Sequence, residues 1–427
     1  MKLGCTSPKA VALLRPARRR RGYGSLLFTM VLVIFIGLLM LVVNYAYLAY
    51  SQLRTAEVTD TLARTALTPL LDEHVLADQA HDQSDDIQQV QSDVALFLQE
   101  LNNAAASGQH LRYVPGSNQS SETDIFVTFG RVDDVTQPVT GGNFTTTLAA
   151  GELFNTLRIE AARPRNGANP LYQMVRGMAF PQAASIGSAS YATLDSRLIG
   201  FRPTNSANSP VVPIGIALGS WNSGRVSDTF LPNGRLELDG RLQSDSQNAT
   251  NANLVLLNFN NRVASGSPFG NTEADRVVTQ TLAGIGPGDF DGDYLGPIAP
   301  SQPQAAMQSF RADQSHPDNA QELADMLDDI AQSNEPRRIF TLYDNYNDNT
   351  HVANLVGFVA ARVLQSDVVN VANGMSTTPQ LRVILEPTFY VHFTAETART
   401  IDADGNSTTS FDDVPENLYI HKLRLSR

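Results

Sequence analysis

The chain of 427 residues contains a single cysteine, Cys5, near its beginning. Disulfide bridges, cysteine metal centres and a cysteine nucleophile are therefore excluded from the rest of the chain. Lysine is almost as scarce and occurs only at positions 2, 9 and 422. The phosphate-binding patterns GxGxxG and GxxxxGK[ST] are absent, as are HExxH and GxSxG. We therefore expect no ATP-dependent, metallohydrolase or serine-hydrolase chemistry, and we expect that the protein is not an enzyme.

Acidic residues are missing from the first part of the chain and dominate the remainder. Residues 1–50 carry seven basic side chains and no acidic one, whereas the other 377 residues carry 24 basic and 43 acidic side chains. The total formal charge is −12, and the part after residue 50 has a net charge of −19. Such a body repels polyanions, so we expect no nucleic-acid partner.

Charge is also missing from Gly22 through Leu53, which suggests a membrane anchor. The run from Leu26 to Val43 is entirely apolar except for Thr29, and its 18 residues would form a helix of roughly 27 Å, close to the hydrocarbon thickness of a bilayer. Arginines at positions 18 to 21 precede it, and Tyr45, Tyr47 and Tyr50 follow at the expected interface. We therefore predict a basic cytoplasmic segment over 1–25 and a single transmembrane helix over 26–50.

The distribution of basic residues also predicts an orientation for this helix. By the positive-inside rule the N-terminus stays in the cytoplasm, and the acidic body lies outside the cytoplasmic (inner) membrane. The alternative is a cleaved secretory signal, with Ala46 and Ala49 as the small residues of a cleavage site. The apolar run exceeds the usual signal-peptide core of about 7–15 residues, which favours a retained anchor.

After the anchor the sequence predicts an α+β body in which strands are in the majority. Residues 51–107 favour helices, with a kink or an end at Pro69, and we interpret them as a helical stalk. The second helical stretch within it, 71–105, is consistent either with packing against a partner or with lying on the body. We further predict a β-rich domain over 108–218 and a mixed α+β domain over 219–427.

Alternating apolar patterns indicate the strands of the body, and one helix is expected over 319–330. Two prolines in NSPVVPIGI, 208–216, suggest an edge strand or a linker for that segment. The strands are expected at 124–129, 157–161, 189–194, 197–201, 234–238, 253–257, 338–342, 354–364 and 380–393.

Several strings in the chain carry a family resemblance. They are Arg20-Arg21-Gly22, the apolar helix ending at Asn44, and the continuation LRTAEVTDTLARTA, 53–66. Further matches are LFNTLRIEAARPRNGANPLYQMVRGMAF, SASYATLDSRLIGFRP, NLVGFVAARVLQ and LRVILEPTF. Together they resemble the TadE/TadG-like family of the bacterial tight-adherence (Flp) pilus-assembly system. The resemblance implies a membrane-anchored, non-catalytic scaffold whose partners are the lipid bilayer and other pilus-assembly or secretion subunits.

Three departures limit what this resemblance implies. Leu27 stands where the family often has the glutamate associated with prepilin processing, and Val58 stands where it has an aspartate. The DxSxS metal site of relatives with a von Willebrand type A domain is absent. The adhesive metal chemistry of those relatives is therefore not carried over.

One acidic string suggests a different function. Asp289, Asp291 and Asp293 recur at every second residue around Gly292, and Ca²⁺ prefers such oxygen ligands. The positions of Gly and Glu do not fit an EF-hand, so the alternatives are a calcium loop of another type or a solvated acidic turn. The shorter string Asp402-Ala-Asp404-Gly405 also fits a hairpin turn. With calcium at the first string, the protein would be a membrane-tethered adhesin or ligand-binding protein.

Overall fold

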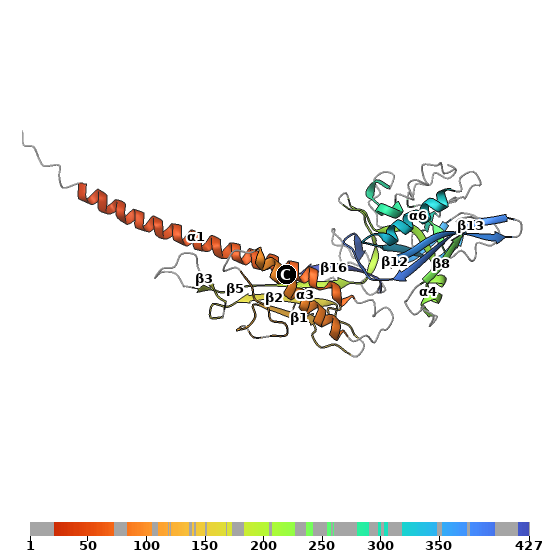
Figure 1. Ribbon diagram of the computed structural model, residues 1–427. Helices are drawn as coiled ribbons and strands as arrows, with labels where there is room; N and C mark the ends of the chain where they lie inside the picture. The colour runs from red at the N-terminus through yellow and green to blue at the C-terminus, as the bar shows by residue number, and fades with distance from the viewer. Residues whose placement is uncertain are drawn as a thin grey trace, which may run out of the picture.

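The computed structural model shows a mixed α+β protein in which one long apolar helix precedes a strand-rich body (Figure 1). Figure 1 shows this helix as a rod that leaves the body on one side, while the second of two lobes lies at the opposite end. The structure describes residues 21–71, 83–104, 110–117, 119, 121–135, 139–140, 142–149, 152–167, 169–172, 183–204, 207–226, 236–241, 254–257, 259, 280–289, 298–299, 303–305, 318–347, 352–373, 376–397 and 417–426.

The helix α1 (Arg21–Ala66) is continuous across the predicted anchor and the beginning of the predicted stalk. Within the described residues it is the one helix long and apolar enough to cross a membrane, with a mean hydropathy of 3.2 in its best 18-residue window. None of that window is buried. The helix ends before Pro69, which lies in the short 3₁₀ helix η2 (Thr68–Leu70), as a proline predicts.

The second half of α1 lies on the body. Asn44 is only 4% exposed, and from Ser51 onward buried positions recur at helical spacing along one face of α1. The second helix, α3 (Ser84–Asn103), packs beside it and buries Val90, Val94 and Leu98. The described parts of 51–107 therefore lie on the body, which decides between the two arrangements left open by the sequence.

Both helices cover one face of a five-stranded sheet. Its strand order is β1-β2-β5-β16-β14, from β1 (Ile125–Gly130), β2 (Thr156–Arg163), β5 (Ile186–Asp195), β16 (Ile420–Ser426) and β14 (Tyr390–Val391). Alternate residues of β2, Leu157, Ile159 and Ala161, are buried in a core shared with α1 and α3. Burial on one face with polar side chains on the other explains the alternating pattern of this strand.

A polar seam fixes α1 against β5. The hydroxyl of Thr59 lies 3.3 Å from that of Ser188 and 3.0 Å from that of Ser190, and Ser190 also donates to the carboxylate of Asp60. The strand carries Gly, Ser and Ala at successive positions over 187–190, so the helix approaches closely. The buried hydroxyls of this seam are hydrogen-bonded, as buried polar groups require.

The second lobe is built on a larger sheet in the order β8-β13-β12-β11-β7-β9, with β10 paired to β12. The helix α6 (Asp318–Gln332) buries Leu323, Leu327 and Ile330 in the core of this lobe, and it confirms the predicted helix. The strands are β7 (Val211–Ala217), β8 (Leu236–Arg241), β9 (Leu254–Leu256), β10 (Pro303–Ala305), β11 (Arg337–Asn347), β12 (Val352–Asn373) and β13 (Ser376–Pro387).

The segment that suggested an edge or a linker is an interior strand, so that prediction is wrong. The strand β7 lies between β11 and β9 and pairs parallel with β11. Its near-continuous apolar run is typical of a buried parallel strand. Pro213 is tolerated because it falls in a register shift between the pairs of Val211 and Gly215, where the ladder is interrupted.

Short elements complete the described fold. Two small sheets pair β3 (Leu171–Tyr172) with β4 (Ala183–Ala184), and β6 (Leu198–Phe201) with β15 (Ala395–Thr397). The helix α4 (Leu218–Val226) contacts β7 and β11, and it carries the single tryptophan, Trp221. The indole N–H of Trp221 donates to the hydroxyl of Tyr419 over 3.1 Å, which anchors the start of the C-terminal strand.

The two sheets exchange strands across the predicted domain boundary at 218/219. The strand β7 precedes that boundary but belongs to the second sheet, whereas β16 follows it and belongs to the first. An ion pair with a buried carboxylate fixes β16 beside β5, because the half-buried Arg424 donates from Nε to the carboxylate of Asp195 over 2.6 Å. An apolar pattern identifies a strand but not the sheet it joins, so the division between sheets follows only from the tertiary structure.

Candidate functional site

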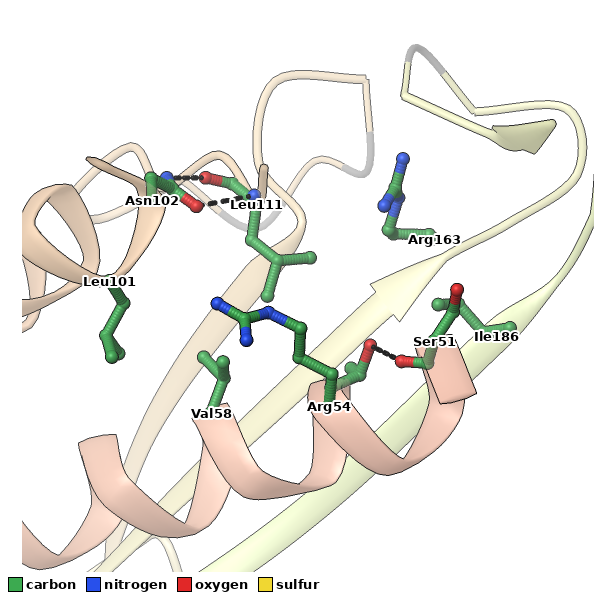
Figure 2. A pocket seen from close by; sticks show the side chains of 9 residues that line it. Ser51, Arg54, Val58, Leu101, Asn102, Leu111, Arg163 and Ile186 are labelled. Carbon is green, nitrogen blue, oxygen red and sulfur yellow. Dashed lines mark hydrogen bonds between the residues drawn. The ribbon is translucent and has the colours of Figure 1, made fainter. Parts of the chain in front are cut away.

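The most distinctive polar site lies where α1 leaves the predicted membrane region and meets the first sheet. A small pocket of about 10 Å³ opens there between α1, α3 and the adjoining ends of β2 and β5 (Figure 2). This volume suits roughly one water molecule. The pocket is lined by Ser51, Arg54, Thr55, Val58, Leu101, Asn102, Leu111, Arg163 and Ile186.

Asn102 ties the end of α3 to the segment that follows. Its side-chain amide donates to the carbonyl of Leu111 over 2.7 Å, and the Leu111 N–H donates back to Asn102 Oδ1 over 3.0 Å. This reciprocal pair replaces the hydrogen bonds of a regular strand partner. It places the buried side chain of Leu111 against the pocket.

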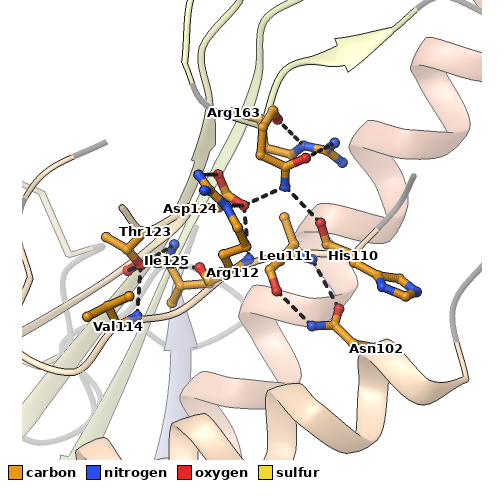
Figure 3. A network of polar contacts seen from close by, with 10 residues as sticks. Asn102, His110, Leu111, Arg112, Val114, Thr123, Asp124, Ile125 and Arg163 are labelled. Atoms are coloured by element: carbon orange, nitrogen blue, oxygen red, sulfur yellow. Dashed lines mark hydrogen bonds and ion pairs between the residues drawn. The ribbon is translucent and has the colours of Figure 1, made fainter. Parts of the chain in front are cut away.

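Asp124 is the acidic centre of the adjoining network (Figure 3). Its side chain is 1% exposed and accepts hydrogen bonds from the backbone N–H of Arg112 over 2.9 Å and from Asn169 Nδ2 over 2.6 Å. The guanidinium of Arg112 completes an ion pair at 3.4 Å. These donors hold the buried carboxylate in place between Arg112 and Asn169.

Arg163 ends β2 and is buried beside this centre. Its Nε donates to the carbonyl of Asn169 over 2.9 Å and its Nη2 donates to Asn169 Oδ1 over 3.0 Å. Burial lowers the pKa of Arg163, and the charge of Asp124 opposes that change. Because an arginine starts far above neutral pH, the side chain stays cationic. Asn169 therefore bridges a buried cation and a buried anion.

Arg54 approaches the same pocket from α1. Figure 2 shows its guanidinium between Leu111 and Val58, away from Arg163. In the part of the chain that the structure describes, the Arg54 side chain has no hydrogen bond or ion pair. The hydroxyl of Ser51, one turn earlier, is buried and likewise has no partner among the described residues. The site can therefore offer donors to a negatively charged or polar group.

The sequence directed attention to a different place. Asp289 ends the short 3₁₀ helix η4 (Pro287–Asp289), where its Oδ2 accepts the Gly286 N–H over 2.6 Å. Asp291 and Asp293 lie outside the described residues, as does the string at 402–405. Among the described residues there is no group of three or more His, Cys, Asp or Glu that could hold a metal ion. The calcium loop thus stays a prediction.

A second, open cavity of about 540 Å³ lies in the second lobe. Its polar residues are Asn208, Arg338 and His392. Arg338 donates to the carbonyls of Leu282, Glu335 and Arg337, so its guanidinium supports the loops that form the cavity. These contacts give Arg338 a structural role.

His392 has a defined tautomer in this cavity. The backbone N–H of Thr394 donates to Nδ1 over 3.2 Å, so the ring carries its proton on Nε2 when neutral. Burial lowers the pKa of His392 to about 4, which keeps the ring neutral at pH 7. The ring also stacks against Tyr390 and against Phe393, with centroid separations of 5.7 Å and 4.6 Å.

Pattern reasoning did not single out Arg54, Asp124 or Arg163. The sequence contained one signal that could have identified Arg54, because it is the first charged residue after Arg21. The other two come from strand ends whose side chains meet only in the folded protein. Comparisons with protein-family models, with curated proteins and with solved structures find no match.

Proposed function

We propose that the protein is a membrane-anchored, non-catalytic scaffold of the bacterial envelope, a TadG-like component of Flp/Tad-type pilus assembly or secretion. Its N-terminus is cytoplasmic and its body faces away from the cytoplasm. The proposal is supported most by the continuity of α1, whose exposed apolar half leads without a break into a half that is buried on the body. A continuous helix passes the orientation of the anchor directly to the body.

Two further features support a scaffold. The resemblance of 20–66 to the TadE/TadG-like family covers the part of the chain that forms this rigid connection. The body also offers strand edges for pairing, and β1 is the outer strand of the first sheet. Exposed strand edges bind extended segments of other chains by main-chain hydrogen bonds. We assign no bond-making or bond-breaking role to any residue.

The test is photo-crosslinking in the native host, with a photoreactive amino acid at Thr128 of β1. We expect crosslinks to pilus-assembly or secretion subunits, together with a mature chain that retains residue 1. A matched probe at Arg337 in the second lobe controls for random collision. Recovery of no such subunit, with normal adhesion after deletion of the gene, would contradict the proposal. A new N-terminus after Ala46 or Ala49 would identify a released protein instead.

A further inference from the structure

The open cavity of the second lobe lies where four separate segments of the chain meet. They are 207–210, which leads into β7, 282–284, Arg338 near the start of β11, and His392, which follows β14. The volume of about 540 Å³ falls within the roughly 300–1,000 Å³ that is typical of pockets for small molecules. The cavity is therefore large enough to hold a small organic ligand.

Backbone hydrogen bonds fix the walls of this cavity. Ser209 and Ile285 exchange two hydrogen bonds of 2.8 Å each, and the N–H of Ile339 donates to the carbonyl of Pro210 over 3.1 Å. Gly284 has a φ of +77°, and a Cβ at this position would lie 2.2 Å from the carbonyl oxygen of Ser209, so only glycine allows the two segments to approach this closely. The protein's own main chain thus forms the cavity, without the help of a ligand.

Three side chains that line the cavity have N–H groups to offer. Arg338 uses three of its five N–H groups on backbone carbonyls, so its Nε–H and one Nη2–H have no partner among the described residues. The Nε2–H of neutral His392 and one amide N–H of Asn208 likewise have no partner in the described part of the chain. Water hydrates such groups in an open cavity, and a ligand that displaces this water must supply acceptors.

The charge of the lining favours an acceptor with a single negative charge. Among the described residues that line the cavity, Arg338 is the one charged side chain, and no carboxylate is present. Two acidic residues of the same segments lie outside this lining, because Glu335 pairs with Arg337 at 3.2 Å and Asp289 accepts the N–H of Gly286. One cation with two neutral donors matches a carboxylate better than a phosphate dianion, and carboxylates bind arginine through strong, charge-assisted hydrogen bonds.

Exposed apolar side chains lie beside these donors. Leu282 and Pro210 line the cavity, and the Leu282 side chain is 49% exposed. Phe393 is 62% exposed, and its ring stacks on that of His392. An apolar group of a ligand would cover such side chains and remove their surface from water, while its carboxylate meets Arg338. The cavity therefore suits an acid that also has an apolar part.

We infer that this cavity binds the carboxylate of an organic acid that carries an apolar group, with Arg338, His392 and Asn208 as the donors. A free organic acid and the C-terminal residue of a polypeptide share this chemistry. The inference goes beyond the proposed scaffold and is independent of the anchor, because none of the residues that line the cavity belongs to α1. Its failure would leave the scaffold proposal, which crosslinking tests, unaffected.

The test titrates N-acetylphenylalanine into the full chain in an uncharged detergent at pH 7, and saturation-transfer NMR measures the dissociation constant. The control ligand is N-acetylphenylalaninamide, which has the same apolar group and no negative charge. We expect a dissociation constant on the order of 1 mM for the acid. The amide should bind roughly ten-fold more weakly or less, because it cannot accept charge-assisted hydrogen bonds. Equal binding of acid and amide, or no saturable binding of the acid, would overturn the inference.

Variants of the lining locate the bound carboxylate. Arg338→Gln should weaken binding of the acid by roughly ten-fold or more. Arg337→Gln removes the same charge from the neighbouring residue outside the lining, and it should change the dissociation constant by less than about two-fold because salt screens exposed charges. Since Arg338 also holds three loop carbonyls, His392→Phe is the second variant, which keeps a ring for stacking and removes the donor. It should weaken binding by roughly three- to ten-fold.

Circular dichroism shows whether each variant keeps its fold, and if Arg338→Gln does not, His392→Phe decides. Unchanged binding of the acid in His392→Phe and in folded Arg338→Gln would overturn the inference, as would equal losses in Arg338→Gln and Arg337→Gln.

A longer probe distinguishes the two sources of the carboxylate. Acetyl-trialanyl-phenylalanine presents the same terminal residue at the end of a peptide. Tighter binding than that of N-acetylphenylalanine would identify the C-terminus of a polypeptide as the ligand, whereas equal or weaker binding would identify a free organic acid. Both results support the carboxylate site, provided that the peptide with an amidated C-terminus binds roughly ten-fold more weakly. Equal binding of the free and the amidated peptide would count against it.

Discussion

At the scale of single residues, the ion pair between Asp195 and Arg424 is expected to stabilise the fold. The Asp195 side chain is 1% exposed and also accepts the backbone N–H of Arg197 over 3.1 Å. Asp195→Ala leaves Arg424 without its counter-ion, and we expect a loss of about 3 kcal/mol in the free energy of unfolding. Denaturant unfolding of the full chain in detergent, followed by circular dichroism, measures this loss.

The control is an ion pair of the same kind at the surface. Glu335 and Arg337 lie 3.2 Å apart with both side chains exposed to solvent. Glu335→Ala should therefore cost less than about 1 kcal/mol. Similar losses in the two variants would show that the Asp195 pair contributes no more than a surface pair.

Two histidines make stability depend on pH. Burial lowers the pKa of His392 and of His421 to about 4, and both ring nitrogens of His421 are buried without a partner among the described side chains. In the unfolded chain a histidine titrates near 6.5, so between pH 6.5 and 4 the unfolded state binds more protons. The contribution of the two neutral histidines to stability is therefore fully present above pH 6.5, and it is lost as the pH falls toward 4.

The expected slope is up to about 1.4 kcal/mol per pH unit for each histidine, measured by denaturant unfolding at pH values from 7 to 5. His421→Gln should flatten the profile, because the substituted side chain does not titrate in this range. His110→Gln, at an exposed position, is the matched control and should leave the profile unchanged. A profile equally steep in His421→Gln would show that carboxylates, not His421, govern it.

At the scale of elements, the docking of α1 on the first sheet depends on its buried apolar positions. Leu62 of α1 is fully buried in the core that this helix forms with α3 and the sheet. Leu62→Ala should lower the free energy of unfolding by about 2–5 kcal/mol, because it removes buried surface and leaves a cavity. Leu53→Ala is the matched control on the same helix, since Leu53 is exposed and should contribute little. Equal effects would show that the second half of α1 is not docked.

The sequence predicts best those elements whose residue pattern depends on the local environment of the element itself. The 3.6-residue spacing in α6 and the alternation in β2 follow from burial on one side, whereas the apolar run in α1 is continuous because no face of it is polar, and all three were predicted. The strand β16 was not predicted, although Leu423 and Leu425 alternate, because seven residues give a weak signal. The helix α4 was missed because two glycines reduce its helical propensity, and its burial depends on Trp221 meeting Tyr419.

The candidate site was less predictable than the fold for a physical reason. Arg54, Asp124 and Arg163 come from a helix, the start of β1 and the end of β2, and only the packing of these elements places them together. The acidic string at 289–293 has short sequence spacing and was therefore visible, but local spacing does not establish a site. Asp289, the described member, binds the backbone N–H of Gly286.

At the scale of the whole molecule, the chain passes from the first lobe to the second and back, but each lobe has its own hydrophobic core. The core of the first lobe joins α1, α3 and the five-stranded sheet, whereas the core of the second joins α6 and the larger sheet. The strand β16 is the sequence-distant component of the first lobe, because it pairs with β5 more than 200 residues away. The helix α1, which carries the predicted anchor, thus packs on a sheet that is completed by a strand more than 200 residues later in the chain.

The pairing of β16 with β5 predicts which lobe loses protection from hydrogen exchange when β16 is disrupted. Leu423 pairs with Leu194 of β5, and Leu423→Pro fixes φ and places a ring inside this interior strand, which disrupts β16. We expect hydrogen exchange measured by mass spectrometry to increase in β5, β2 and the docked half of α1, while β12 and β13 keep their protection. Leu423→Ala introduces no backbone constraint and should change exchange far less. Loss of protection in both lobes after Leu423→Pro would show that they unfold as one cooperative unit, and the docking of α1 on the first sheet would then depend on the entire body.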